Sequence, residues 1–182
     1  GAGGVLTNIP GLMPATTAIP PLGTGSPNAL TVTIGAGGAG ESGPTNPTPS
    51  RPGADTTMSG PGPISLTAVG GGGASATNGG PYGGQPGGSG GGARIGRSPL
   101  DGGTGTTGQG NPGGPSSGGG GGAGAAGDTT APGHVDGHGG IGVQLPPAFR
   151  DPKSSIGAPG PGGTKYWVAG GGGGGYYDGK GG

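Results

Sequence analysis

The sequence predicts a fold with little regular secondary structure: a bundle of polyglycine-II or polyproline-II-type helices with a few short β-strands and no α-helix. Three observations predict it. Of the 182 residues, 60 are glycine and 22 are proline, and hydrophobic residues make up only 25 %. Glycine costs about 1 kcal/mol and proline about 3 kcal/mol per interior α-helical position relative to alanine, which excludes helices. Side-chain-free tracts recur between short linkers, so glycine itself must supply the ordered structure.

Two segments show the alternation of apolar and polar residues that is typical of half-buried strands. Residues 29–34 place Leu30, Val32 and Ile34 on one side, and we expect these side chains to form a small hydrophobic anchor. Residues 64–69 repeat the pattern. We expect this second segment to pair with the first.

A third apolar segment, residues 165–169, holds the single tryptophan, Trp167. We expect Tyr166 and Trp167 to cover the apolar strands as a small cap. All three segments run directly into glycine, so strands and tracts are expected to belong to the same ordered unit.

Glycine tracts have two competing states. Disorder is favoured by the large conformational entropy that glycine loses on folding. The alternative is a bundle of helices with three residues per turn, whose N–H and C=O groups point outward and must be satisfied by neighbouring tracts. In such a bundle, we expect the uninterrupted tracts 70–73, 118–122 and 170–175 to lie innermost. Tract 102–114 carries proline, threonine and other side chains and is expected to lie outside.

Composition also restricts the class of protein. Seven basic and seven acidic residues cancel, so the clustered positive charge that nucleic acid or anionic lipid attracts is missing. There is no cysteine for disulfides and no apolar run of about 18 residues for membrane insertion. We expect one glycine-rich domain over residues 1–182, excerpted from a longer protein at both ends.

Motifs that carry chemistry in other proteins are incomplete. Residues 35–40 match G-x-G-x-x-G after a strand, but the proline-rich residues that follow cannot form the helix that a dinucleotide site needs, so no cofactor is expected. His134, Asp136 and His138 are close in sequence. They lack a fourth metal ligand, and we interpret them as polar surface. The remaining carboxylates are scattered and no nucleophile elbow occurs, so no enzyme is expected.

Aromatic side chains are rare, at 3 % of residues, and several fall in linkers that would lie at the bundle ends. Flat rings can stack on sugars or fill receptor pockets. Linker 144–156 is the most distinctive because it combines an aromatic residue with an Arg-Asp-Pro-Lys run. The candidate receptor-binding residues are Tyr82, Phe149, Arg150, Lys153, Tyr176 and Tyr177.

The ordered series of tracts carries a resemblance across nearly the whole chain. It runs GAGGVLTN, NALTVTIGAGGAG, LTAVGGGG, QPGGSGGG, TGQGNPGG, SSGGGGGGAGAAG, GHGGIGV and YWVAGGGGGG. This series resembles the glycine-rich domain of bacteriophage and viral tail and fibre proteins, including the polyglycine-II tip adhesins of long tail fibres. The chain departs from those adhesins because it has no recognisable fibre-attachment domain.

The resemblance implies a virion structural protein at the virion surface, whose loops recognise a host. Its partners would be a host cell-surface receptor, protein or glycan, and other tail or appendage proteins, with homo-oligomerisation left open. An extracellular filament or matrix protein assembled through glycine-rich tracts is the alternative. Ice binding is a weaker one, because it needs a regular face of Thr or Ala and no such spacing is visible in the sequence.

Overall fold

Regular secondary structure is sparse in the protein. The computed structural model describes residues 1–14, 18, 29–40, 51–75, 83–94, 101–129, 137–153, 156–174 and 180–182. The elements are β1 (Thr31–Thr33), β2 (Thr56–Ser59), β3 (Ser65–Ala68), β4 (Val143–Gln144), β5 (Trp167–Val168) and the 3-10 turns η1 (Pro147–Phe149) and η2 (Pro161–Gly163). No α-helix occurs in these described ranges. The predicted fold class, with a few short strands and otherwise irregular backbone, is confirmed.

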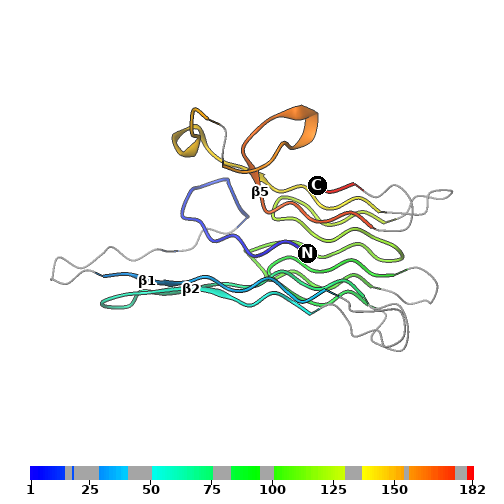
Figure 1. The fold of residues 1–182 in the computed structure, drawn as a ribbon, viewed down its shortest axis with the longest axis horizontal. Coiled ribbons are helices and arrows are strands. Elements are labelled where there is room, and N and C mark those ends of the chain that lie inside the picture. Colours follow the sequence, from blue (N-terminus) through cyan, green and yellow to red (C-terminus); the bar gives the residue numbers. More distant parts are fainter. Residues whose placement is uncertain are drawn as a thin grey trace.

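Extended glycine tracts make up most of the molecule. Figure 1 shows them running side by side along the longest axis, from the blue and cyan layer of β1 and β2 through the green tracts to the yellow and red ones. Glycines with a positive φ, such as Gly11 and Gly62, lie in turns. A polyproline-II-type helix makes no hydrogen bonds within itself, so the backbone hydrogen bonds of the tracts mostly join segments that are distant in sequence.

Tract 118–122 is the innermost part of the bundle, as predicted. All five of its glycines are buried. A β-strand pairs with at most two neighbours, whereas this tract exchanges backbone hydrogen bonds with six segments. The bonded residues in those segments are Ala2, Gly90, Asn111 and Gly114, Ala125 and Asp128, Gly140 and Gly172. Neighbours can approach on every side because no Cβ stands in the way.

Tract 70–73 is also largely enclosed. Its amides and carbonyls bond to Gly53, to Gly88 and Ser89, and to the Gly1 amine. The N-terminal segment is thus threaded through the bundle, since Ala2 in turn donates to the central tract.

Two predictions about tract position are wrong. In tract 170–175 only Gly171 is buried, and Gly170, Gly172 and Gly173 are exposed, while residue 175 lies outside the described residues. Tract 102–114 is not an outer layer, because Gly103, Gly113 and Gly114 are buried. A missing side chain permits burial without enforcing it, so tract order along the chain and the available neighbours decide the position.

The strand segments 29–34 and 64–69 do not pair with each other. The sheet order is β1-β2-β3, both pairs antiparallel, with Val32 opposite Met58 and Met58 opposite Leu66. β2 was not predicted, because Met58 is its only apolar side chain. It occupies the central position because it joins β3 through a short Gly-Pro turn and brings Met58 between the apolar residues of its neighbours.

The predicted hydrophobic anchor at β1 is wrong as well. Leu30, Val32 and Ile34 are 40 %, 53 % and 75 % exposed. β1 is an edge strand whose neighbour in the sheet is β2. Only the side chains of β2 flank those of β1 within the sheet, which leaves the β1 side chains exposed. Ile64, which precedes β3, is the residue of this region that is buried.

A second small sheet and the main apolar cluster lie elsewhere in the bundle. β4 pairs with β5 in antiparallel fashion. Met13, Ala123 and Val143 form the buried cluster, and Val168 and Ala169 pack against it. Tyr166 and Trp167 therefore belong to the β4–β5 sheet rather than capping β1 to β3, which corrects the expectation for these two residues.

Candidate functional site

Within the linker 144–156, residues 145–151 are built as a braced loop on the β4–β5 sheet, and residues 154 and 155 lie outside the described residues. Tyr166 accepts a backbone hydrogen bond from Leu145 at 2.9 Å, and its hydroxyl donates to the Asp151 carbonyl at 2.7 Å. Arg150 lies over the same ring, 5.5 Å from its centroid, and its Nε donates to the Leu145 carbonyl at 2.8 Å. The loop and the β5 strand therefore hold each other in one arrangement.

This bracing divides the candidate residues of the loop into two groups. Arg150 is half-buried and engaged within the protein, so its guanidinium positions the loop. Phe149, at the end of η1, is 57 % exposed, and Lys153 is exposed. An apolar ring and an ammonium group are thus presented to solvent from an ordered backbone.

The other candidate residues cannot be placed. Tyr82, Tyr176 and Tyr177 lie outside the described residues, as do His134 and Asp136. His138 is described and exposed, and its Nδ1 accepts a hydrogen bond from the Lys180 amide at 3.1 Å. In the described ranges, no three His, Cys, Asp or Glu side chains gather as metal ligands would.

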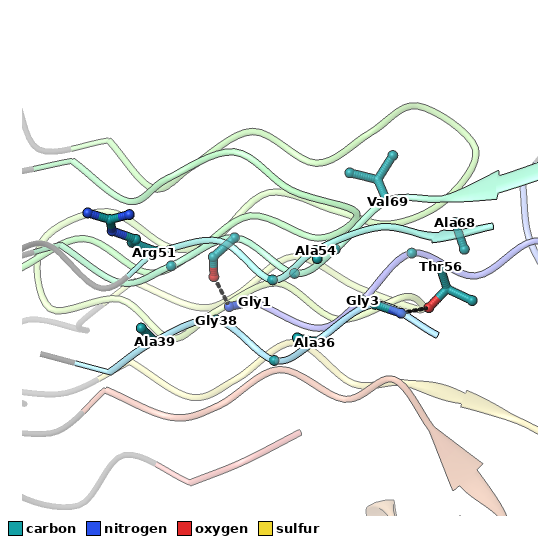
Figure 2. Close-up of a pocket in the computed structure, with 18 of the residues that line it drawn as sticks. Gly1, Gly3, Ala36, Gly38, Ala39, Arg51, Ala54, Thr56, Ala68 and Val69 are labelled. Atoms are coloured by element: carbon teal, nitrogen blue, oxygen red, sulfur yellow. Dashed lines mark hydrogen bonds between the residues drawn. The ribbon is translucent and has the colours of Figure 1, made fainter. Parts of the chain in front are cut away.

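A groove of about 580 Å³ runs along the glycine tracts on the β1 side of the bundle. Its walls come from four segments: Gly1, Gly3 and Gly4; residues 35–40; Arg51, Gly53, Ala54 and Thr56; and residues 68–74. In Figure 2, Arg51 stands at one end and Thr56, Ala68 and Val69 at the other, with glycine and alanine between them. The lining is therefore mostly backbone and methyl groups.

Tract 35–40, which matches the dinucleotide pattern, forms one wall of this groove. The tract accepts hydrogen bonds from Ala54 and Arg51 along its inner edge, and Gly35 donates to the Thr56 hydroxyl at 3.0 Å. The residues that would follow it as a helix, 41–50, lie outside the described residues. Its described contacts are those of an outer tract in the bundle.

The groove offers little acid–base chemistry. Its ionisable lining groups are the Arg51 guanidinium and the Gly1 amine. Burial lowers the pKa of that amine below its ordinary value, and the amine donates to the Gly72 carbonyl at 2.6 Å. Among the described residues that line the groove, none carries a carboxylate or a thiol.

One face of the β1–β3 sheet carries only hydroxyl side chains. The register aligns Thr31 with Ser59 and Ser65, and Thr33 with Thr57 and Thr67. All six are exposed, at strand spacings of about 4.8 Å and about 6.7 Å. A regular threonine face was not expected from the sequence because these residues come from three separate segments.

Fold and sites together define a bundle of glycine tracts that carries two small antiparallel sheets and a braced loop beside β4 and β5. A family model for a glycine-rich domain matches residues 1–182, and the chain belongs to that family. No curated protein and no solved structure matches it. Within the described residues, no helix is long and apolar enough to cross a membrane.

Proposed function

We propose that the protein is a rigid scaffold segment of a virion tail fibre or other appendage, which displays loops for recognition of a host cell-surface receptor. In this role it is a structural and binding protein without enzymatic activity. It acts at the virion surface, together with other tail or appendage proteins. The resemblance of its tract series to glycine-rich tail and fibre proteins supports the proposal.

The observation that carries the proposal is the exposed Phe149 on a loop whose backbone is held in place. A recognition loop binds more tightly when little conformational entropy is lost on contact. Arg150 and Tyr166 supply that order here, through the stacking and hydrogen bonds of the β4–β5 loop. Aromatic side chains are frequent anchors in receptor pockets and on sugar faces.

The tract bundle supplies the matching scaffold property. Its order comes from backbone hydrogen bonds between tracts and needs few side chains. Linker sequences can therefore vary without disturbing the bundle, which is the property that a receptor-binding surface requires.

An extracellular filament or matrix protein remains the second candidate. The observation that favours it is the exposed outer tract of residues 36–40 beside the open groove. Exposed backbone edges of this kind promote association between chains. In that case the tracts would bind each other, and the loop at Phe149 would have no receptor.

Competition for virion adsorption tests the first proposal. The purified domain is expected to block adsorption of the native virions to host cells, and Phe149→Ala is expected to lower its potency about tenfold, as loss of an aromatic anchor does. Ile141→Ala is the matched control, because Ile141 is also exposed, at 39 %, but lies on a tract. Equal potency of the wild type and Phe149→Ala would remove Phe149 as the anchor.

Immunogold electron microscopy separates the two candidates. An antibody against residues 144–156 is expected to label the distal ends of virion appendages. Gold along continuous fibres without attached particles would overturn the virion proposal and favour the filament.

A further inference from the structure

The outer edge of β1 is the least protected backbone edge of the β1–β3 sheet. The opposite edge, on β3, is capped by Gln109. Its Nε2 donates to the Thr67 carbonyl at 3.0 Å and its Oε1 accepts from the Val69 amide at 2.9 Å. No described residue pairs with the outer edge of β1. Among the described residues, the sheet thus has one covered edge and one open edge.

The residues of the open edge also lack the features that normally prevent pairing. Edge strands are usually protected by lysine, proline or a bulge. Residues 29–34 contain none of these side chains, and β1 pairs with β2 in unbroken register. Leu30, Val32 and Ile34 expose 40 %, 53 % and 75 % of their surfaces on the same strand. The edge therefore offers both free backbone groups and apolar surface.

The pattern of this strand is symmetric about Val32. Leu30 and Ile34 flank it at two residues on either side, and Thr31 and Thr33 at one residue. An antiparallel copy centred on Val32 places Val32 opposite itself, each threonine opposite a threonine, and Leu30 opposite Ile34. Opposed residues share a face, so apolar side chains meet apolar side chains and hydroxyls meet hydroxyls.

We propose that the protein forms a twofold symmetric homodimer by antiparallel pairing of β1 with β1 of a second copy, centred on Val32. The two three-stranded sheets then become one six-stranded sheet. Such an interface is isologous and closed: both outer edges of the joined sheet are β3 strands capped by Gln109, so the pairing stops at two copies. The hydroxyl face and the apolar face each continue across the axis.

The interface is small compared with the roughly 1,200–2,000 Å² of stable complexes. The dimer is therefore expected to be weak and to appear with rising protein concentration. Sedimentation velocity over about two decades of concentration would show the shift from one copy to two, without larger species.

Cysteine cross-linking tests the register directly, because the chain contains no cysteine. Paired Cα atoms of antiparallel strands lie about 4.5–5.5 Å apart, within the range of about 4.4–6.8 Å for a disulfide. Val32→Cys is thus expected to form a disulfide dimer under mild oxidation at least about tenfold faster than Ile141→Cys. Ile141 is an exposed apolar residue on another tract, 39 % exposed against 53 % for Val32. Leu30→Cys alone is expected to stay uncross-linked, since its copies would be about 14 Å apart, but to cross-link when mixed with Ile34→Cys.

Introducing a charge at residue 32 provides a second test that does not depend on oxidation. Val32→Lys brings two ammonium groups together across the axis, and dimerisation is expected to weaken at least about tenfold. An equimolar mixture of Val32→Lys with Val32→Glu is expected to restore it, because residue 32 faces itself. This rescue also shows that neither variant is unfolded.

Three results would overturn the proposal. The first is a wild-type protein that stays monomeric at every concentration tested. The second is cross-linking of Val32→Cys at the rate of Ile141→Cys. The third is assembly into open-ended fibres, which a closed twofold pairing forbids.

Discussion

The substitution Gly121→Ala tests whether close approach of backbones is what holds the bundle together. A Cβ on Gly121 would come closer than 3.0 Å to the carbonyl atoms of Asn111 and the oxygen of Pro112. These are backbone atoms, which cannot turn aside as a flexible side chain does. The tract would have to shift away, straining the hydrogen bonds of Gly121 to Gly90 and Ala2.

The magnitude follows from these contacts. Overpacking an interior site costs about 1–3 kcal/mol, and each weakened hydrogen bond adds about 1 kcal/mol. We therefore expect Gly121→Ala to lower the free energy of unfolding by about 3 kcal/mol or more. At about 2–4 °C per kcal/mol for a chain of this size, the Tm falls by about 6–12 °C.

Two further glycines complete the series. Gly37→Ala meets no atom within 4 Å and restricts the unfolded chain, so the Tm is expected to rise by about 1–4 °C. Gly120 lies in the same tract as Gly121 but meets its nearest atom, the Gly1 nitrogen, at 3.1 Å, and Gly120→Ala is expected to fall between the other two.

Differential scanning calorimetry of the four proteins gives the comparison. Equal Tm shifts for Gly121→Ala and Gly37→Ala would refute the reasoning, because an added methyl group meets backbone atoms at Gly121 and nothing within 4 Å at Gly37. A Gly121→Ala protein that does not fold at all would agree with the expected direction, and Gly120→Ala would then measure the graded effect.

Two other predictions concern side chains inside the bundle. Gln109→Ala removes both hydrogen bonds that cap β3, at Thr67 and Val69. Because both backbone groups lose their partner, the free energy of unfolding measured with a chemical denaturant is expected to fall by about 1–3 kcal/mol. An unchanged unfolding midpoint would show that water replaces the side-chain amide. Ser89 is fully buried, and its hydroxyl has no hydrogen-bond partner among the residues that the structure describes. Ser89→Ala is therefore expected to raise the unfolding free energy by about 1 kcal/mol, and a loss of stability would mean that the hydroxyl is satisfied after all.

The pattern of apolar and polar side chains predicts where most of the strand segments lie. Alternating residues identified the segments that contain β1 and β3, because alternation expresses the two faces of a strand whatever its partner. The segment that contains β5 was identified as a short apolar run. The sequence does not predict β2, because a single methionine among Thr and Ser does not form an alternating pattern. Composition alone indicates the loop as a candidate binding loop. The positioning role of Arg150 depends on the Tyr166 ring, which only the fold brings next to it.

The sequence by itself determined that helices are excluded and that glycine tracts carry the order. Only the tertiary structure decided which tract neighbours which, that tract 170–175 lies mostly outside, and that β1 forms an open edge. The physical reason is that most backbone hydrogen bonds of such tracts run between segments that are distant in sequence. A glycine has no side chain to distinguish one neighbour from another, so the pairing is a property of the whole chain.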